Sequence, residues 1–100
     1  MMILVNQLIF DERNRKHIKK HQVMQSEIEK SFADEYAVFI SGYNDRIILL
    51  GRSGERLITT VVQRQTIDTL YYVVTARDMA KKERAIYRLE KAKKEQNYEK

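Results

Sequence analysis

The two histidines of the chain, His17 and His21, lie four residues apart and are the first candidates for chemistry. Imidazole has an ordinary pKa near neutral pH, which suits it to act as a general acid or base. The structural alternative is a pair of partly buried, hydrogen-bonded rings that fix a helix to a sheet. The same spacing is typical of a metal-binding pair, but the chain has no cysteine and no obvious third ligand. We therefore expect no metal and no other cofactor, and a metal-dependent hydrolase is our third hypothesis.

A second group of chemically capable residues lies near the C-terminus. Glu83 falls on the apolar stripe of the last predicted helix, four residues before Tyr87. Because an unpaired buried carboxylate is costly, the pattern predicts an ion pair with Arg77 or Arg84. Such a pair could hold the helix on the sheet. Alternatively, the arginines could lie beside a scissile phosphate, because metal-free RNA cleavage needs a base, an acid and cations that stabilise the phosphorane.

The overall charge indicates a polyanionic partner. The 100 residues include 19 Lys and Arg against 14 Asp and Glu, which gives a net charge of +5. One cluster of cations contains Arg13, Arg15, Lys16, Lys19 and Lys20, and the other contains Lys81, Lys82, Arg84, Arg88, Lys91, Lys93 and Lys94. Basic charge favours nucleic acids through counterion release and steering, although a soluble, lysine-rich helix surface has the same composition.

Length and composition indicate one small domain, residues 1–100. The chain has no proline and three glycines, which argues against disorder. Its first ten residues are mostly apolar, but no basic region precedes them and Asp11 and Glu12 follow at once. This run is too short to cross a bilayer. We therefore expect a cytoplasmic protein with no signal segment and no membrane contact.

Hydrophobic periodicity predicts two helices near the N-terminus. A strand over residues 4–10 should end at Asp11, which is a suitable N-cap for a helix over residues 12–21. Met24, Ile28 and Phe32 recur at helical spacing and predict a second, amphipathic helix.

The remainder of the chain predicts a sheet and a final helix. Strands are expected over residues 36–40, 47–50, 56–63 and 70–76, and a helix over residues 79–96 precedes a frayed tail at 97–100. We interpret Gly51–Gly54 as a hairpin turn with Arg52 exposed, and the last strand as central because both of its faces are apolar. The predicted class is α+β, with two N-terminal helices and a C-terminal helix packed on one twisted, mainly antiparallel sheet of about four to five strands.

Two segments of the chain combine into a pattern known from one protein family. Phe10–His21 contains an aromatic residue, an aspartate, an asparagine and a Lys-His pair. Thr75–Met79 reads Thr-Ala-Arg-Asp-Met and is followed by Lys82–Arg84 and Tyr87. Over roughly residues 8–90, their order and spacing resemble the BrnT family of type II toxin–antitoxin toxins. Gln22 stands where that family often has glycine.

The resemblance implies a fold similar to that of the RelE-like ribonuclease toxins and a toxin that cleaves RNA and blocks translation. It also implies a cognate antitoxin, usually of the ribbon-helix-helix type, and contact with DNA only through that antitoxin. The positions that match the family patterns are the candidate catalytic residues His17, His21, Arg77, Glu83, Arg84 and Tyr87.

We therefore expect a metal-independent endoribonuclease toxin that acts on RNA or on the ribosome, and we also consider a dimer. Arg77 and Arg84 would flank a phosphate-sized site opposite the histidines, and Glu83 would position an arginine or act as a base. The candidate RNA contacts are Lys20, Arg52, Lys82 and Arg88. The alternative is a non-catalytic RNA- or protein-binding module on the same fold, in which the Arg77–Glu83 pair is purely structural.

Overall fold

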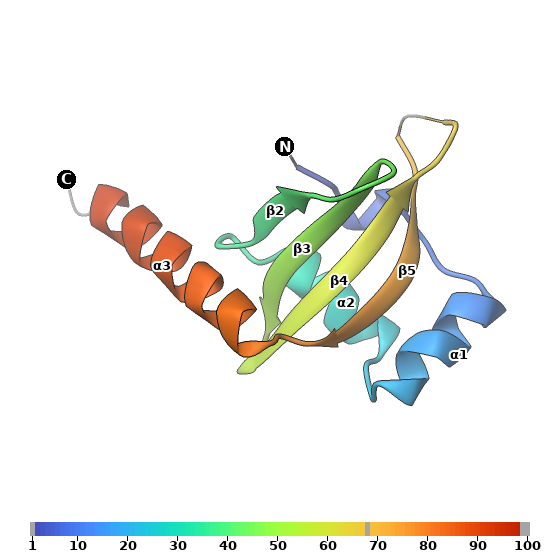
Figure 1. Ribbon diagram of the computed structural model, residues 1–100, viewed down its shortest axis with the longest axis horizontal. Coiled ribbons are helices and arrows are strands. Elements are labelled where there is room, and N and C mark those ends of the chain that lie inside the picture. Colours follow the sequence, from blue (N-terminus) through green and yellow to red (C-terminus); the bar gives the residue numbers. More distant parts are fainter. Residues whose placement is uncertain (1, 68, 99–100) are drawn as a thin grey trace.

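The computed structural model describes residues 2–67 and 69–98, and it describes residues 97 and 98 by their backbone alone. Within these residues the fold is α+β, as predicted, with one five-stranded sheet of order β1-β5-β4-β3-β2 (Figure 1). The strands are β1 (Leu8–Ile9), β2 (Val38–Ser41), β3 (Arg46–Ser53), β4 (Arg56–Arg64) and β5 (Tyr71–Asp78). The α-helices are α1 (Glu12–Lys20), α2 (Gln25–Phe32) and α3 (Lys81–Tyr98). The sheet is mainly antiparallel, because only β1 pairs in parallel, with β5.

Helix α1 begins at the predicted cap. The Asp11 carboxylate accepts the backbone N–H of Asn14 at 2.9 Å, and the Asn14 side-chain oxygen accepts the N–H of Asp11 at 2.8 Å. This reciprocal pair satisfies two N–H groups that the start of a helix leaves without partners. Glu12 then places a negative charge in the first turn, where the helix dipole favours it.

The end of α1 is a Schellman turn. The N–H of Val23 donates to the carbonyl of Ile18 at 3.1 Å, and the N–H of Gln22 donates to Lys19 at 2.9 Å. Ile18 and Val23 are each 2% exposed and supply the apolar contact that accompanies this motif. The turn places Gln22 at φ 59°, in the left-handed region that glycine adopts at least cost. Arg56 of β4 completes the turn by donating to the carbonyl of Gln22 at 2.7 Å.

One face of the sheet carries the main core. Ile28 and Phe32 of α2 are buried against a layer that includes Leu49 and Val62, and Figure 1 shows α2 behind the sheet. Gly51 allows this close packing, because a Cβ atom there would lie 2.4 Å from the carbonyl oxygen of Ser31.

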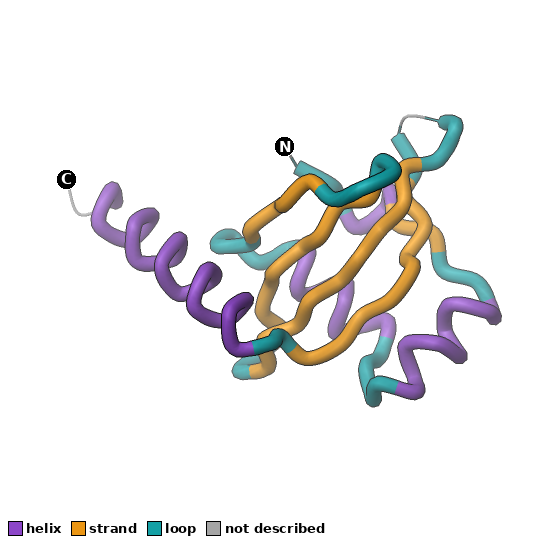
Figure 2. Tube along the Cα trace, viewed as in Figure 1, coloured by secondary structure: helices purple, strands orange, loops and turns teal. Residues whose placement is uncertain are grey.

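The other face of the sheet is covered only in part. Leu50, Met79 and Tyr87 form a small second core where α3 starts. Figure 2 shows that α3 crosses one corner of this face and then runs away from the sheet. The opposite ends of β3, β4 and β5 are therefore left without a helix above them, on the side where α1 borders the sheet (Figures 1 and 2).

Several sequence predictions about the strands are wrong in detail. The expected strand over residues 4–10 is a 3₁₀ helix (Val5–Gln7) followed by the two-residue strand β1, because the Gln7 side chain accepts the N–H of Leu4 at 2.7 Å and closes a local turn. Strand β3 continues through residues 51–53 of the expected turn, and the reversal comes at its last residue, Gly54, with φ 61°. Arg52 is exposed, as predicted.

The predicted central strand has a partner along only part of its outer edge. Strand β1 pairs with Tyr71 and Tyr72, and the rest of that edge of β5 lies beside α1. On α2, Met24 is 66% exposed and caps the helix instead of joining its apolar stripe. Helix α3 continues to Tyr98, into the expected frayed tail, and residues 99 and 100 lie outside the described residues.

Replacing Gln22 with glycine should stabilise the fold. A glycine at this left-handed position removes the steric cost of a side chain, and we expect the free energy of unfolding to rise by about 1 kcal/mol and Tm by about 4–8 °C. Thermal and urea unfolding monitored by circular dichroism would measure both quantities. The control is Lys19→Gly, one turn earlier at a right-handed helical position, which should lower the stability by about 1 kcal/mol. A Gln22→Gly protein no more stable than wild type would contradict the left-handed conformation.

Candidate nucleic-acid interface

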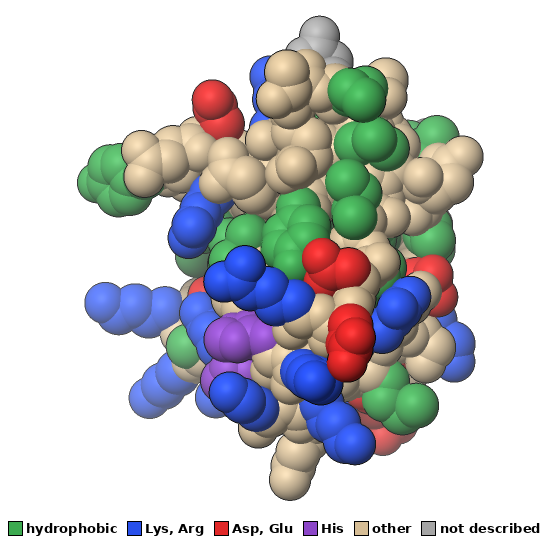
Figure 3. Space-filling view, turned by 90° about the vertical axis from the view of Figure 1, so that its right-hand side faces the viewer, with side chains coloured by type: hydrophobic (Ala, Val, Ile, Leu, Met, Phe, Trp, Pro, Cys, Tyr) green, Lys and Arg blue, Asp and Glu red, His purple; other side chains and the backbone are tan. Residues whose placement is uncertain are grey.

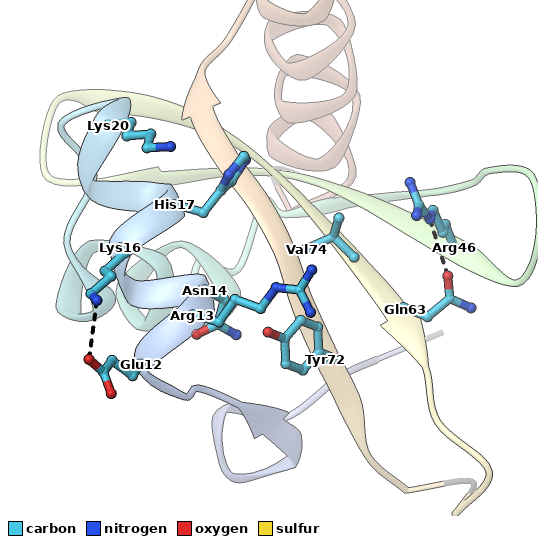
Figure 4. A pocket seen from close by; sticks show the side chains of 10 residues that line it. All are labelled: Glu12, Arg13, Asn14, Lys16, His17, Lys20, Arg46, Gln63, Tyr72 and Val74. Atoms are coloured by element: carbon cyan, nitrogen blue, oxygen red, sulfur yellow. Dashed lines mark hydrogen bonds and ion pairs between the residues drawn. The ribbon is translucent and has the colours of Figure 1, made fainter.

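A groove of about 940 Å³ separates α1 from the uncovered end of the sheet. Helix α1 forms one wall, and side chains of β3, β4 and β5 form the floor and the opposite wall (Figure 4). The lining residues are Glu12, Arg13, Asn14, Lys16, His17, Lys20, Arg46, Gln63, Tyr72 and Val74.

The groove is strongly basic. Arg13, Lys16 and Lys20 project from successive turns of α1, and Arg46 faces them from β3. The acid that lines the groove, Glu12, is 3.2 Å from Lys16 in an exposed i, i+4 ion pair. Figure 3 shows Lys and Arg side chains gathered around the two histidines on this side of the molecule. The arrangement suits a chain of phosphates, which binds by exchanging its counterions for Lys and Arg side chains.

His17 points into this groove and is held by β5. Its Nε2 atom lies 3.1 Å from the hydroxyl oxygen of Thr75, and its ring meets that of His21 edge to face, with 5.6 Å between centroids. Both histidines are exposed, so the expectation of partly buried rings is wrong. The buried positions of α1 are Asn14 and Ile18. His17 is therefore an exposed imidazole on the wall of the groove, with its Nε2 atom beside the hydroxyl of Thr75.

Asn14 is the residue that fixes α1 in place, and sequence analysis assigned it no role. Its side-chain nitrogen donates to the carbonyl of Ile9 at 2.9 Å and to that of Val73 at 3.0 Å. The side chain is 2% exposed, and it reaches β5 beside the irregularity where the pairing with β4 skips Val74. The extra residue leaves Val74 on the floor of the groove.

Arg77 and Glu83 form the ion pair that the sequence predicted as one alternative. Two guanidinium nitrogens of Arg77 donate to the two carboxylate oxygens of Glu83 at 2.7 and 3.0 Å. Glu83 also accepts the hydroxyl of Thr59 at 2.9 Å and the backbone N–H of Ala80 at 2.7 Å. The bond from Arg77, followed by those from Ala80 and Thr59, lowers the pKa of Glu83 from 4.5 to about 2 against the opposing effect of burial. The pair joins the end of β5 to the first turn of α3.

Two other candidate catalytic residues also bond within the fold. Arg84 donates to the carbonyl of Met79 at 2.7 Å. Tyr87 is 2% exposed, and its hydroxyl donates to Asp34 at 2.6 Å. Burial, and then the hydrogen bond to Asp34, raises the pKa of the Tyr87 phenol well above its usual range. Asp34 also accepts the backbone N–H of Arg52 at 3.0 Å, so it ties the loop after α2 to β3 and to α3.

The candidate residues from the sequence therefore divide into separate places. His17 and Lys20 line the groove, and His21 lies beside His17 but does not line it. The remaining candidates lie outside the groove: Arg77, Glu83, Arg84 and Tyr87 at the junction of β5 and α3, Lys82 and Arg88 on the exposed side of α3, and Arg52 near the end of β3.

Other residues that complete the groove were not predicted from the sequence. Arg13 and Lys16 were placed in a basic cluster but were not assigned to a site. Arg13 lies three residues before Lys16 and four before His17, and Lys16 lies four before Lys20, which indicates a shared helix face. Arg46, Gln63 and Tyr72 carried no such signal, because they come together only through the pairing of β3, β4 and β5.

The described part of the chain offers no ready metal centre and no membrane span. No three histidine, aspartate or glutamate side chains of residues 2–67 and 69–98 are grouped so that they could hold a metal ion. No helix in the same ranges is long and apolar enough to cross a membrane. Models of known protein families and curated proteins give no match to this chain.

The Arg77–Glu83 pair predicts a pH-dependent stability. The pKa of Glu83 is lower in the folded state than its ordinary value of 4.5, so its contribution is present above that pH and is lost as the pH falls towards 2. We expect Glu83→Gln to lower the free energy of unfolding by about 1–2 kcal/mol at pH 7, and most of this difference should be gone at pH 2.5. Urea unfolding at the two pH values measures it.

Glu90→Gln is the matched control for this measurement, because Glu90 lies on the same helix in an exposed pair with Lys93. It should change stability by less than about 0.5 kcal/mol at either pH. An effect of Glu83→Gln that is equally small at pH 7 would contradict the structural role of the pair.

Proposed function

We propose that this chain is a toxin of a type II toxin–antitoxin system, a metal-independent endoribonuclease whose RNA substrate lies in the groove between α1 and the sheet. The observation that carries this proposal is the position of an exposed His17 among four cations, Arg13, Lys16, Lys20 and Arg46. The BrnT-like segment Phe10–His21 supports it independently, because that segment builds the α1 wall of the groove.

The groove suggests how the reaction would proceed. The phosphodiester backbone would lie along α1, with its charge neutralised by Arg13, Lys16 and Lys20. His17 would accept the proton of a ribose 2′-hydroxyl, the 2′-oxygen would bond to phosphorus, and the bond from phosphorus to the 5′-oxygen would break. The 5′-oxygen would take a proton from water, leaving a 2′,3′-cyclic phosphate. The cations would stabilise the additional negative charge of the phosphorane.

A non-catalytic RNA-binding module is the second candidate, and the junction of β5 and α3 favours it. The residues given catalytic roles on the resemblance are engaged there: Arg77 with Glu83, and Tyr87 with Asp34. Both side chains therefore have a partner within the fold, and Tyr87 is also buried. If cleavage occurs, it would therefore depend on His17 rather than on these residues.

The proposed cellular role follows from the resemblance. The toxin would act in the cytoplasm by cutting RNA, free or on the ribosome, and would be neutralised by a cognate antitoxin of the ribbon-helix-helix type. DNA would be contacted through that antitoxin alone.

The first test is toxicity with cleavage. Induction of the chain in a bacterial host should arrest growth, and the purified protein should cut labelled RNA equally well with and without a chelator. The products should carry 2′,3′-cyclic phosphate ends. RNA binding without any cut would favour the binding module. The absence of both RNA binding and growth arrest would refute the toxin proposal. Cleavage that a chelator abolishes would refute its metal-free chemistry.

The second test concerns His17. His17→Gln keeps a polar group near Thr75 but cannot accept a proton at neutral pH, so RNA binding should stay within about twofold of wild type. The cleavage rate should fall by about 10²–10⁴-fold. His21→Gln removes the neighbouring ring, which lies outside the groove, and should cleave at close to the wild-type rate. Full cleavage by His17→Gln would exclude His17 as the base.

A further inference from the structure

Three side chains form a row across the uncovered end of the sheet. Tyr72 of β5 is the register partner of Gln63 of β4, which is the register partner of Arg46 of β3. Residues directly opposite one another on neighbouring strands point to the same face, and all three side chains line the groove (Figure 4). With strands about 4.8 Å apart, the row extends over about 10 Å. It presents an aromatic ring, an amide and a guanidinium side by side.

The guanidinium of Arg46 is held in a defined orientation. Its Nε donates to the side-chain oxygen of Gln63 at 3.1 Å, and the side-chain nitrogen of Gln63 donates to the carbonyl of Asn44 at 2.8 Å. Asn44 itself is fixed in the β2–β3 turn, with φ 57°. Within residues 2–67 and 69–98, the two terminal nitrogens of Arg46 have no hydrogen-bond partner. The two terminal nitrogens of Arg46 can therefore donate together to one ligand, and their orientation is set before the ligand binds.

The ring of Tyr72 is held in the same way at the other end of the row. Its hydroxyl donates to the Asp11 carboxylate at 3.0 Å. Burial, and then this hydrogen bond, raises the pKa of the Tyr72 phenol. The ring is half-buried beside Val74 on the floor of the groove. A partly exposed aromatic ring in a fixed position on a sheet surface is the kind of platform on which unpaired bases stack.

We infer that the groove selects single-stranded RNA with a guanine, whose base stacks on Tyr72 and whose edge is read by Arg46. This rests on the proposed function for the location of the RNA. The phosphates would follow the cations of α1, and the base would point across the groove to the row on the sheet. The RNA must be single-stranded at this point, because a paired base is not free to stack on a protein ring.

Guanine is the base that matches the donors. Two adjacent nitrogens of an arginine require two adjacent acceptors, which guanine provides in O6 and N7. Adenine places an amino group beside N7 and would need an amide such as that of Gln63, but both ends of this amide are already bonded. Cytosine also has two adjacent acceptors, O2 and N3, but its single ring covers less of Tyr72.

The experiment measures binding of uridine octamers that carry one central G, A, C or U. All are 2′-O-methylated so that they cannot be cut, and binding to the full-length chain is measured by fluorescence anisotropy. The guanine octamer should bind about tenfold more tightly than the other three. Arg46→Ala should reduce this preference to less than about twofold and leave the affinity for the all-uridine octamer within about threefold.

Variants at the other positions separate stacking from charge. Tyr72→Ala should weaken binding of all four octamers by about tenfold. Tyr72→Phe keeps the ring but loses the bond to Asp11, and it should bind more tightly than Tyr72→Ala. Arg64→Ala removes a cation from the same end of β4 that does not line the groove, and it should leave the guanine preference unchanged. Thermal unfolding checks that each variant is folded.

The outcomes distinguish the inference from the function on which it rests. Equal weakening of all four octamers by Arg46→Ala would assign Arg46 to a phosphate and overturn the base-reading role. A preference for cytosine would overturn the choice of guanine. Binding of all four octamers with equal affinity by the wild-type chain would refute the inference and leave the RNA groove standing, whereas no binding of any RNA would refute both.

Discussion

The side-chain amide of Asn14 joins three elements on which the groove depends. Its oxygen caps the start of α1 at Asp11, and its nitrogen bonds the carbonyl oxygens of Ile9 in β1 and Val73 in β5. Because Asn14 is buried, loss of the amide would remove a hydrogen-bond partner from two carbonyl oxygens, and the loss at the buried Val73 carbonyl is costly. The same bonds set the position of α1 along the edge of β5. The cations of α1 therefore face the sheet because of the uncharged side chain of Asn14.

The two faces of the sheet have different roles for a physical reason. Helix α2 covers one face so closely that Gly51 has no room for a side chain, and this face supplies most of the apolar burial. That core leaves the second face free to be incompletely covered, with α3 packed at one corner. Partly exposed polar and aromatic side chains such as Tyr72 and Gln63 can then remain on a sheet surface. Backbone hydrogen bonding between the strands holds them at fixed spacing, which a loop could not do.

Much of this architecture could be predicted from the sequence, because it depends on local patterns. The cap at Asp11, the helical spacing of Ile28 and Phe32, and the β-branched runs each indicate an element through its own neighbours in the chain. The groove could not be predicted in the same way. Tyr72, Gln63 and Arg46 become one row only through strand register, which depends on the Asn44–Asp45 turn and on the irregularity at Val74. The orientation of His17 likewise depends on the hydrogen bonds by which Asn14 fixes α1 beside β5.

The resemblance to a toxin family and the geometry of the site emphasise different residues, and hydrogen bonding explains the difference. The Thr75–Met79 segment and the residues that follow it hold α3 on the sheet. Two guanidinium nitrogens of Arg77 donate to Glu83, and the buried Tyr87 donates to Asp34. A residue pattern that recurs at such a junction can reflect the need to attach a helix to a strand end as readily as the need for catalysis. Thr75 links the two regions, because it lies two residues before Arg77 and its hydroxyl contacts His17.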